Sequence, residues 1–357
     1  MAGSRRLPRD RRIPYVLAAL AAVLAVGGGA LFFQQRTPDA TTVAADGGDA
    51  SSPAATPALP SARPATPVPS ASVSGKPSAR PSVSAITSAG RTPVPAAQFP
   101  TAGSTGVPDK VALRTYKGSC TITKAGTVIE ASDVRCSLVV KAARVVIRKS
   151  RITGTVKVEG GANSLRIEDS DINGGQAFEH TVGFENLTVL RSDISGGQTS
   201  VNCYRNCLIQ DSYLHGQYVP EGEDWHLNAF LSNGGSDIRL IGNTLACDRP
   251  TNSAGGGCTG NASIFGDFAP NTNYTIERNL FVASQEFSYC LYGGYDAKKE
   301  FGTSVRQIVV VDNVFQRGAN GKCGSFGAVT SYDVSASGSR WQGNAWDDGK
   351  PVPPDKG

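Results

Sequence analysis

The chain has 357 residues, of which 39% are hydrophobic and 18% are charged, so it carries enough apolar residues to form a folded core. Its formal net charge of +5 comes from the N-terminus, because residues 1–36 contain six arginines and one aspartate whereas residues 109–357 are near neutral. No basic patch with interleaved aromatic residues occurs elsewhere, which argues against nucleic acid as a partner.

The first predicted element is an apolar segment, residues 13–35, that follows a basic segment, residues 1–12. Residues 13–33 carry no charge over 21 positions, enough for a helix to cross a hydrocarbon core of about 30 Å. Five arginines precede this segment and only Arg36 closely follows it, so the N-terminus is expected in the cytoplasm. We expect a single-pass signal-anchor helix; the alternative is a cleaved signal peptide and a secreted protein.

Residues 36–108 are rich in Pro, Ala, Ser and Thr, with hardly any aromatic residue before Phe99. Such a composition buries too little apolar surface to offset the entropy of ordering, so it predicts a disordered linker. A linker of this length could carry the following domain through a cell wall. The folded domain is predicted at residues 109–348, and residues 349–357 form a short C-terminal tail.

An eight-residue pattern recurs through the predicted domain, with one small polar residue between apolar positions. The polar residues are spaced by 20, 22, 20, 31, 36, 34 and 31 positions, which is typical of a solenoid. The copies are VVIRKSRI (145–152), LRIEDSDI (165–172), LTVLRSDI (187–194), CLIQDSYL (207–214), IRLIGNTL (238–245), YTIERNLF (274–281), IVVVDNVF (308–315) and SRWQGNAW (339–346). Their polar residues are Ser150, Ser170, Ser192, Ser212, Asn243, Asn279, Asn313 and Asn344.

A second short strand is predicted about ten residues before each of the later copies. No stretch keeps a helical period over three turns, so the sequence predicts an all-β solenoid of about eight coils. Residues 110–136 are less regular and are expected to form an N-terminal cap. The upstream strands are predicted at residues 155–158, 177–180, 199–203, 227–232, 262–266, 289–293 and 327–332.

The repeat resembles the right-handed parallel β-helix proteins of the pectate-lyase-like superfamily over about residues 110–348. The nearest local match is HLNAFLSNGGSDIRLIGNTL (226–245), which is similar to the family coil H-x-D-G-I-Q…G-G-S-N-V-T-I…N-T-I but has Asn228 and Ala229 in place of Asp and Gly. The resemblance implies three parallel sheets and a ladder of stacked side chains in the turn between the second and third sheets. It also implies that any working groove lies on the outer face of the first sheet.

All eight cysteines lie in the region predicted to be exported, and their even number fits disulfide bonds in an oxidising compartment. A zinc site at Cys203 and Cys207 is the alternative, although no second close pair supports it. The pairing that joins neighbours in the sequence is Cys120 with Cys136, Cys203 with Cys207, Cys247 with Cys258, and Cys290 with Cys323.

The coils lengthen after Ser212, and long loops on a rigid scaffold are where function usually lies. Three carboxylates in the first long loop, Glu221, Glu223 and Asp224, could hold Ca²⁺ through their oxygen atoms. The alternative is that they form a solvated acidic loop without a ligand. The three inserts are predicted at residues 216–225, 247–258 and 296–305.

Two kinds of catalysis fit the residue types in these coils. A polysaccharide lyase needs a base and a proton donor, for which His226 and Tyr292 are the candidates. A glycoside hydrolase needs two carboxyl groups, for which Asp224 and Asp267 are the candidates. The hallmark motifs of polygalacturonases and classical pectate lyases are absent. If the strands stack in register, one side of the solenoid could carry Glu179, His226, Asp267, Asp296 and Asp333.

A non-catalytic surface protein is the other reading of the same residues. Trp225, Asn228, Tyr295 and Asp296 are the candidate substrate-binding residues, with aromatic rings as platforms for sugars. Tyrosines on coil faces are also common packing residues, and His226 could simply form a hydrogen bond at a strand start. The sequence therefore predicts an exported, membrane-anchored β-helix that acts on or binds polysaccharide, such as a cell-wall glycan. Nothing in it indicates a protein partner.

Overall fold

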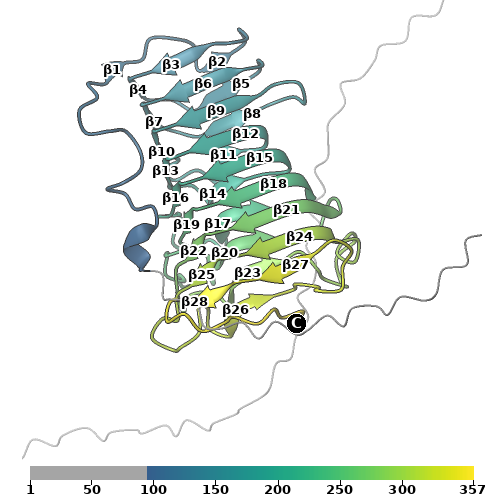
Figure 1. The fold of residues 1–357 in the computed structure, drawn as a ribbon. Helices are drawn as coiled ribbons and strands as arrows, with labels where there is room; N and C mark the ends of the chain where they lie inside the picture. Colours follow the sequence, from purple (N-terminus) through teal and green to yellow (C-terminus); the bar gives the residue numbers. More distant parts are fainter. Residues whose placement is uncertain (1–94) are drawn as a thin grey trace, which may run out of the picture. The chain divides into compact units, whose positions relative to one another are not determined.

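The computed structural model describes residues 95–357, which form three stacked parallel β-sheets (Figure 1). Sheet A has ten strands and sheets B and C have nine each, and neighbouring strands of a sheet come from successive coils. Each coil passes from sheet A to sheet B and to sheet C before it returns to sheet A. The described residues are therefore a parallel β-helix, as the repeat predicts.

The strands are short, and the sheets differ mainly in how their strands lengthen along the chain. Sheet A contains β1 (Arg114–Thr115), β4 (Ser132–Val134), β7 (Arg151–Thr153), β10 (Asp171–Asn173), β13 (Asp193–Ser195), β16 (Tyr213–Leu214), β19 (Thr244–Leu245), β22 (Leu280–Phe281), β25 (Val314–Phe315) and β28 (Ala345–Trp346). Sheet B contains β2 (Thr121–Ile122), β5 (Leu138–Val140), β8 (Val156–Val158), β11 (His180–Gly183), β14 (Thr199–Asn202), β17 (His226–Ser232), β20 (Gly257–Ile264), β23 (Tyr289–Gly293) and β26 (Gly327–Thr330). Sheet C contains β3 (Val128–Glu130), β6 (Val145–Arg148), β9 (Leu165–Glu168), β12 (Glu185–Leu190), β15 (Arg205–Gln210), β18 (Gly235–Ile241), β21 (Asn271–Glu277), β24 (Arg306–Val311) and β27 (Arg340–Gln342).

Two sequence predictions differ from this architecture. The strand expected at residues 177–180 is β11 (His180–Gly183), because Val182 is the residue that pairs with both Val156 and Val201 in the buried column. The expected cap is a regular coil, since residues 114–134 already contribute a strand to each sheet. The strands of this coil are only two or three residues long, so its sequence shows little apolar periodicity.

The described chain begins before the predicted domain boundary. A single 3₁₀ turn, η1 (Ala96–Gln98), starts a segment that lies along the turns between sheets C and A (Figure 1). The backbone N–H of Gly106 donates to the carbonyl of Arg191 at 3.0 Å, and that of Val107 donates to a carboxylate oxygen of Asp171 at 2.9 Å. The predicted signal-anchor helix, residues 13–35, lies outside the described residues. No helix within residues 95–357 is long and apolar enough to cross a membrane.

The small polar column forms a buried hydrogen-bond ladder in the turn from sheet C to sheet A. The backbone N–H and the side-chain Nδ2 of Asn243 both donate to Oδ1 of Asn279, at 2.9 and 3.0 Å. Asn279 repeats both bonds to Asn313, and its Nδ2 also donates to the carbonyl of Leu240 at 2.8 Å. A side-chain amide both donates and accepts, so stacked asparagines satisfy buried polar groups from coil to coil.

Serine hydroxyls accept the corresponding hydrogen bonds in the earlier coils. The backbone N–H of Ser150 donates to Oγ of Ser170 at 3.1 Å, and that of Ser212 donates to Oδ1 of Asn243 at 3.0 Å, which joins the two halves. Ser132 extends the ladder by one coil beyond the sequence pattern, because its N–H donates to Oγ of Ser150 at 3.1 Å. The residue before each ladder position has a positive φ, from 45° to 66°, which turns the chain sharply into sheet A.

The four disulfides have the sequence-local pairing that the cysteine spacing suggested. Cys120 is bonded to Cys136, Cys203 to Cys207, Cys247 to Cys258, and Cys290 to Cys323. No free cysteine remains among the described residues, so the zinc alternative at Cys203 and Cys207 is wrong. Four disulfides in one domain indicate an extracellular or secreted protein.

We expect Asn279→Ala to destabilise the domain by about 3 kcal/mol, because it leaves two buried donors of Asn243 without their acceptor. The free energy of unfolding in guanidinium chloride, followed by circular dichroism, measures the effect. Thr275→Ala is the matched control on the same coil, since Thr275 is only partly buried and should change stability by less than about 0.5 kcal/mol. Equal losses in the two variants would contradict the role of the ladder.

Candidate functional site on the outer face of sheet B

The long loops lie at the edges of sheet B. The chain arrives from sheet A at one edge, which we call the entry edge, and leaves for sheet C at the opposite exit edge. Residues 216–225 and 247–258 precede β17 and β20 and lie at the entry edge, whereas residues 296–305 follow β23 and lie at the exit edge. Two of the three predicted inserts therefore gather on one side, and the third does not.

Successive entry-edge loops are tied together by hydrogen bonds. Nδ2 of Asn252 donates to the backbone carbonyls of Pro220 and Glu223, at 2.7 and 2.8 Å. The N–H of Thr251 donates to a carboxylate oxygen of Glu286 in the following loop at 2.8 Å. Three loops from three coils therefore form one wall beside the outer face of sheet B, and rigid loops of this kind suit ligand binding.

A pocket of about 420 Å³ opens between this wall and the strands β17, β20 and β23. His226 and Tyr292 both line it, together with Thr251, Glu286 and the exposed ring of Phe326. Burial raises the pKa of the Tyr292 phenol above its ordinary value, so the group stays protonated at neutral pH and can donate a proton or a hydrogen bond. The structure thus brings together two of the four predicted catalytic residues.

Sheet B also holds polar atoms that lack partners. Of the buried side-chain polar atoms without a hydrogen bond within residues 95–357, four belong to sheet B: Nε2 of His180, Oδ1 of Asn228, Oγ1 of Thr259 and Oγ of Ser263. Leaving one such group unsatisfied costs about 1–3 kcal/mol, and native proteins rarely do so without a reason.

The register relates these residues to the pocket residue Tyr292. His180 of β11 and Asn228 of β17 occupy the same position on their strands, with Gly260 as the equivalent residue of β20. A Cβ atom at Gly260 would lie 3.2 Å from Oγ of Ser263 and 3.4 Å from the ring of Tyr292. The contact with the Tyr292 ring places this row toward the outer side of sheet B, and of the four residues with unpaired atoms Thr259 lines the pocket itself.

His180 is the most perturbed titratable group of this face. Burial lowers its pKa, and together with the nearby positive charge of Lys157, which acts in the same direction, brings it to about 4. The Phe184 ring covers the imidazole, with 4.1 Å between the ring centroids. Lys157 itself forms an ion pair with Glu179. His180 is therefore a neutral imidazole at physiological pH.

Aromatic rings flank the floor at the entry edge. Phe178 is 61% exposed and packs edge-on against Trp225 with 4.9 Å between centroids. Further along the face, Phe326 is 66% exposed and lies 6.0 Å from the ring of Tyr289, which in turn lies 6.0 Å from Tyr292. Exposed rings beside a polar floor match the apolar faces and hydroxyl edges of sugar rings.

The predicted hydrolase pair is not brought together. Asp224 precedes β17 at the entry edge, whereas Asp267 follows β20 at the exit edge. The seven residues of β17 span roughly 20 Å at about 3.3 Å per residue, which exceeds the 5 to 10 Å that two catalytic carboxyl groups require. Asp267 is instead paired with Lys299 at 2.7 Å.

The remaining predicted residues divide between the two edges. Tyr295 lies at the exit edge beneath Nζ of Lys356, 4.0 Å from its ring centroid, and Asp296 accepts a hydrogen bond from the N–H of Lys298. Asp333, also at the exit edge, is bonded to Lys356 at 2.8 Å, and this hydrogen bond lowers the Asp333 pKa to about 2. These residues are thus separated from Trp225 and Asn228, and the expected single row of acidic groups divides between two edges.

The three carboxylates predicted to bind Ca²⁺ do not converge. Oε1 of Glu221 accepts hydrogen bonds from the hydroxyl and the N–H of Ser253, at 2.5 and 3.2 Å, and so ties its own loop to the next one. Glu223 and Asp224 are exposed to solvent. Within residues 95–357, no group of three or more His, Cys, Asp or Glu side chains is arranged to hold a metal ion.

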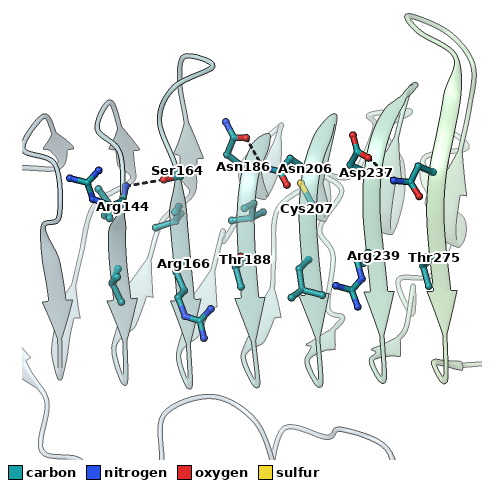
Figure 2. A pocket seen from close by; sticks show the side chains of 16 residues that line it. Arg144, Ser164, Arg166, Asn186, Thr188, Asn206, Cys207, Asp237, Arg239 and Thr275 are labelled. Atoms are coloured by element: carbon teal, nitrogen blue, oxygen red, sulfur yellow. Dashed lines mark hydrogen bonds between the residues drawn. The ribbon is translucent and has the colours of Figure 1, made fainter.

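Sheet C carries a second recess, a shallow trough of about 540 Å³ that crosses its strands (Figure 2). One side is a row of polar side chains that bond to each other: Asn206 donates to Asn186 at 2.9 Å, and Asn273 donates to Asp237 at 2.6 Å. All four have φ between 51° and 60°, a conformation that Asn and Asp tolerate best. The row is explained by the chain's turn into sheet C, and no long loop encloses the trough.

Sequence reasoning missed several residues of the sheet B groove. Phe178 and Phe326 were not singled out, because an isolated phenylalanine in a short apolar run predicts a core position. Glu286 and Thr251 carry no motif at all. Their inclusion depends on loop contacts between coils, which spacing within one coil does not encode. The signal that did exist was the density of aromatic and polar residues in the loops that precede the sheet B strands.

Comparisons of the chain with protein-family models, with curated proteins and with solved structures found no match.

We expect stability to fall between about pH 6.5 and pH 4 because of His180. Its native pKa of about 4 lies below the ordinary value of 6.5, so the unfolded chain takes up a proton over this range that the native protein does not. The free energy of unfolding in urea at about pH 7 and about pH 4.5 should differ by about 2 to 3 kcal/mol more in the wild type than in His180→Gln. The same pH dependence in both proteins would contradict a buried neutral imidazole.

Proposed function

We propose that the protein is an extracytoplasmic β-helix that binds polysaccharide along the outer face of sheet B. One observation carries the proposal: the pocket on the outer face of sheet B combines the exposed ring of Phe326 with polar side chains, among them the Thr259 hydroxyl, which has no hydrogen-bond partner within residues 95–357. A chain of sugar rings offers both complementary features, since its hydroxyls bond to polar atoms and its ring faces pack on aromatic surfaces.

The ladder supports a place in the pectate-lyase-like superfamily. In that family stacked amides lie in the turn between the second and third sheets, and the turn from sheet C to sheet A has this arrangement. The equivalent of the family's first sheet is then sheet B. If the chain belongs to this superfamily, its β-helix is right-handed and the outer face of sheet B is its working surface.

The proposed location is the outside of a cell, with the N-terminal segment as membrane anchor. Four disulfides support an oxidising compartment. The uncharged stretch at residues 13–33 supports an anchor, and the composition of residues 36–94 supports a tether between anchor and β-helix. A protein held in this way could reach a cell-wall glycan.

Lyase activity is a second candidate function, favoured by the shared position of His226 and Tyr292 in the entry-edge pocket. His226 would remove the proton next to a uronate carboxyl group, and Tyr292 would protonate the leaving oxygen. The uronate carboxylate needs a cation to stabilise the charge that develops, and Ca²⁺ bound together with the substrate would supply it. A hydrolase is less well supported, because Asp224 and Asp267 lie at opposite edges.

We expect Trp225→Ala and Phe326→Ala each to weaken the binding of the preferred polysaccharide about tenfold, because each removes an aromatic surface beside the groove. Affinity electrophoresis or calorimetry with a panel of neutral and acidic polysaccharides measures the change. Val128→Ala removes an exposed apolar side chain, 52% accessible, from the first strand of sheet C and should leave binding unchanged. Unchanged affinity in all three variants would contradict polysaccharide binding on the outer face of sheet B.

For the lyase, incubation with acidic polysaccharides and Ca²⁺ should release unsaturated uronate products that absorb in the ultraviolet. His226→Gln should reduce the rate by at least about 100-fold, because the pocket loses its base. If the wild type binds acidic polysaccharide but releases no such product, the protein is a binding module and not a lyase.

A further inference from the structure

The exit edge of sheet B has a recess of its own, away from the entry-edge pocket. This slot has a volume of about 580 Å³ and runs across the turns that follow β8, β11, β14, β17 and β20. Three aromatic residues line it and remain exposed: Phe184 at 40%, Tyr204 at 42% and Phe268 at 73%. Exposed rings gathered around one recess mark an interaction site more strongly than scattered apolar residues do.

The walls of the slot are held in place by the backbone. The disulfide between Cys203 and Cys207 closes a short loop around Tyr204. In the next turn, a Cβ atom at Gly235 would lie 1.7 Å from the carbonyl oxygen of Tyr204, and one at Gly234 would lie 2.3 Å from that of Ala269. Only glycine allows this approach, so the turn between the two aromatic walls is low and forms a floor.

The spacing of the walls fits one flat ring. The Tyr204 and Phe268 turns are two coils apart, which is about 10 Å at about 4.8 Å per coil. A ring packed between two carbon surfaces needs about 7 to 8 Å, because carbon atoms pack at about 3.5 to 4.0 Å. Turns two coils apart therefore leave space for one ring between side chains that face each other across the slot.

The polar groups of the slot indicate which kind of ring it binds. The side-chain amides of Asn202 and Asn233 line it, both are partly buried, and neither has a hydrogen bond within residues 95–357. The charges nearby cancel: Glu185 is paired with Arg205 at 2.5 Å, and Glu159 with Lys141 at 3.2 Å. A ligand for this slot should offer apolar ring faces and hydroxyl edges and should carry no net charge.

We propose that the exit-edge slot binds one uncharged pyranose residue, stacked between Tyr204 and Phe268 and bonded through its hydroxyls to Asn202 and Asn233. An aromatic side chain of a peptide would fill the walls but leave both amides unsatisfied. A uronate would place a carboxylate beside Glu185 and Glu159 with no unpaired cation to receive it. This site is separate from the sheet B groove and does not depend on the function proposed there.

The test uses the full chain and three probes: methyl glycosides of neutral hexoses, the corresponding methyl uronates, and a short peptide with one tyrosine. Saturation-transfer NMR and calorimetric titration should detect a neutral hexoside. Phe268→Ala and Asn233→Ala should each weaken its binding at least tenfold. Val128→Ala is the control, because it removes an exposed apolar side chain, 52% accessible, from sheet C, and it should leave hexoside binding unchanged.

Four results would overturn the proposal: no binding of any neutral hexoside, tighter binding of the uronate, tighter binding of the peptide, or equal losses in Phe268→Ala and Val128→Ala. Failure of the sheet B groove has a different signature. In that case Trp225→Ala and Phe326→Ala would leave polysaccharide binding intact, while the response of the hexoside to Phe268→Ala would remain.

Discussion

The structure depends on the hydrogen bonds that satisfy the buried turn between sheets C and A. At that turn the N–H of one residue per coil points at the next coil, and a serine or asparagine side chain there accepts it. Because the ladder must advance by one residue per coil, no residue can be inserted at this turn without leaving a buried N–H unpaired. The spacing of the ladder nevertheless rises from 20 to 36 residues along the chain. The added residues must therefore enter the other two turns, on either side of sheet B.

This constraint divides the molecule into a scaffold and a variable face. Sheets A and C adjoin the ladder, and the polar side chains along the sheet C trough are bonded to each other. Sheet B lies between the two turns that tolerate insertions, so it receives the long loops and the exposed rings. Four of the six buried side-chain polar atoms without partners among residues 95–357 also belong to its strands. The unpaired atoms reduce the stability of the fold, and the hydrogen bonds of the ladder offset this loss. Such a division is expected where a rigid scaffold presents a binding surface.

The sequence was sufficient to predict the scaffold. A serine or asparagine recurs at one position per coil, and this repeat predicts the fold and most of the strands. The cysteine spacing predicts the four disulfides. It was not sufficient for the site, because a site built from several coils depends on register and on loop contacts. Asp224 and Asp267 are equally plausible in sequence, yet one precedes its strand and the other follows its strand, so they lie at opposite edges. His226 and Tyr292 both belong to one pocket because both face the entry-edge loops.

The most direct test of this division is hydrogen–deuterium exchange of the full chain, measured with and without the polysaccharide that it binds most tightly. The account predicts that the ligand protects the backbone of the entry-edge loops, residues 247–258, 283–288 and 323–326, while exchange in sheet C is unchanged. Protection confined to the trough on sheet C, or spread evenly over the three sheets, would contradict the claim that sheet B is the working face of this β-helix.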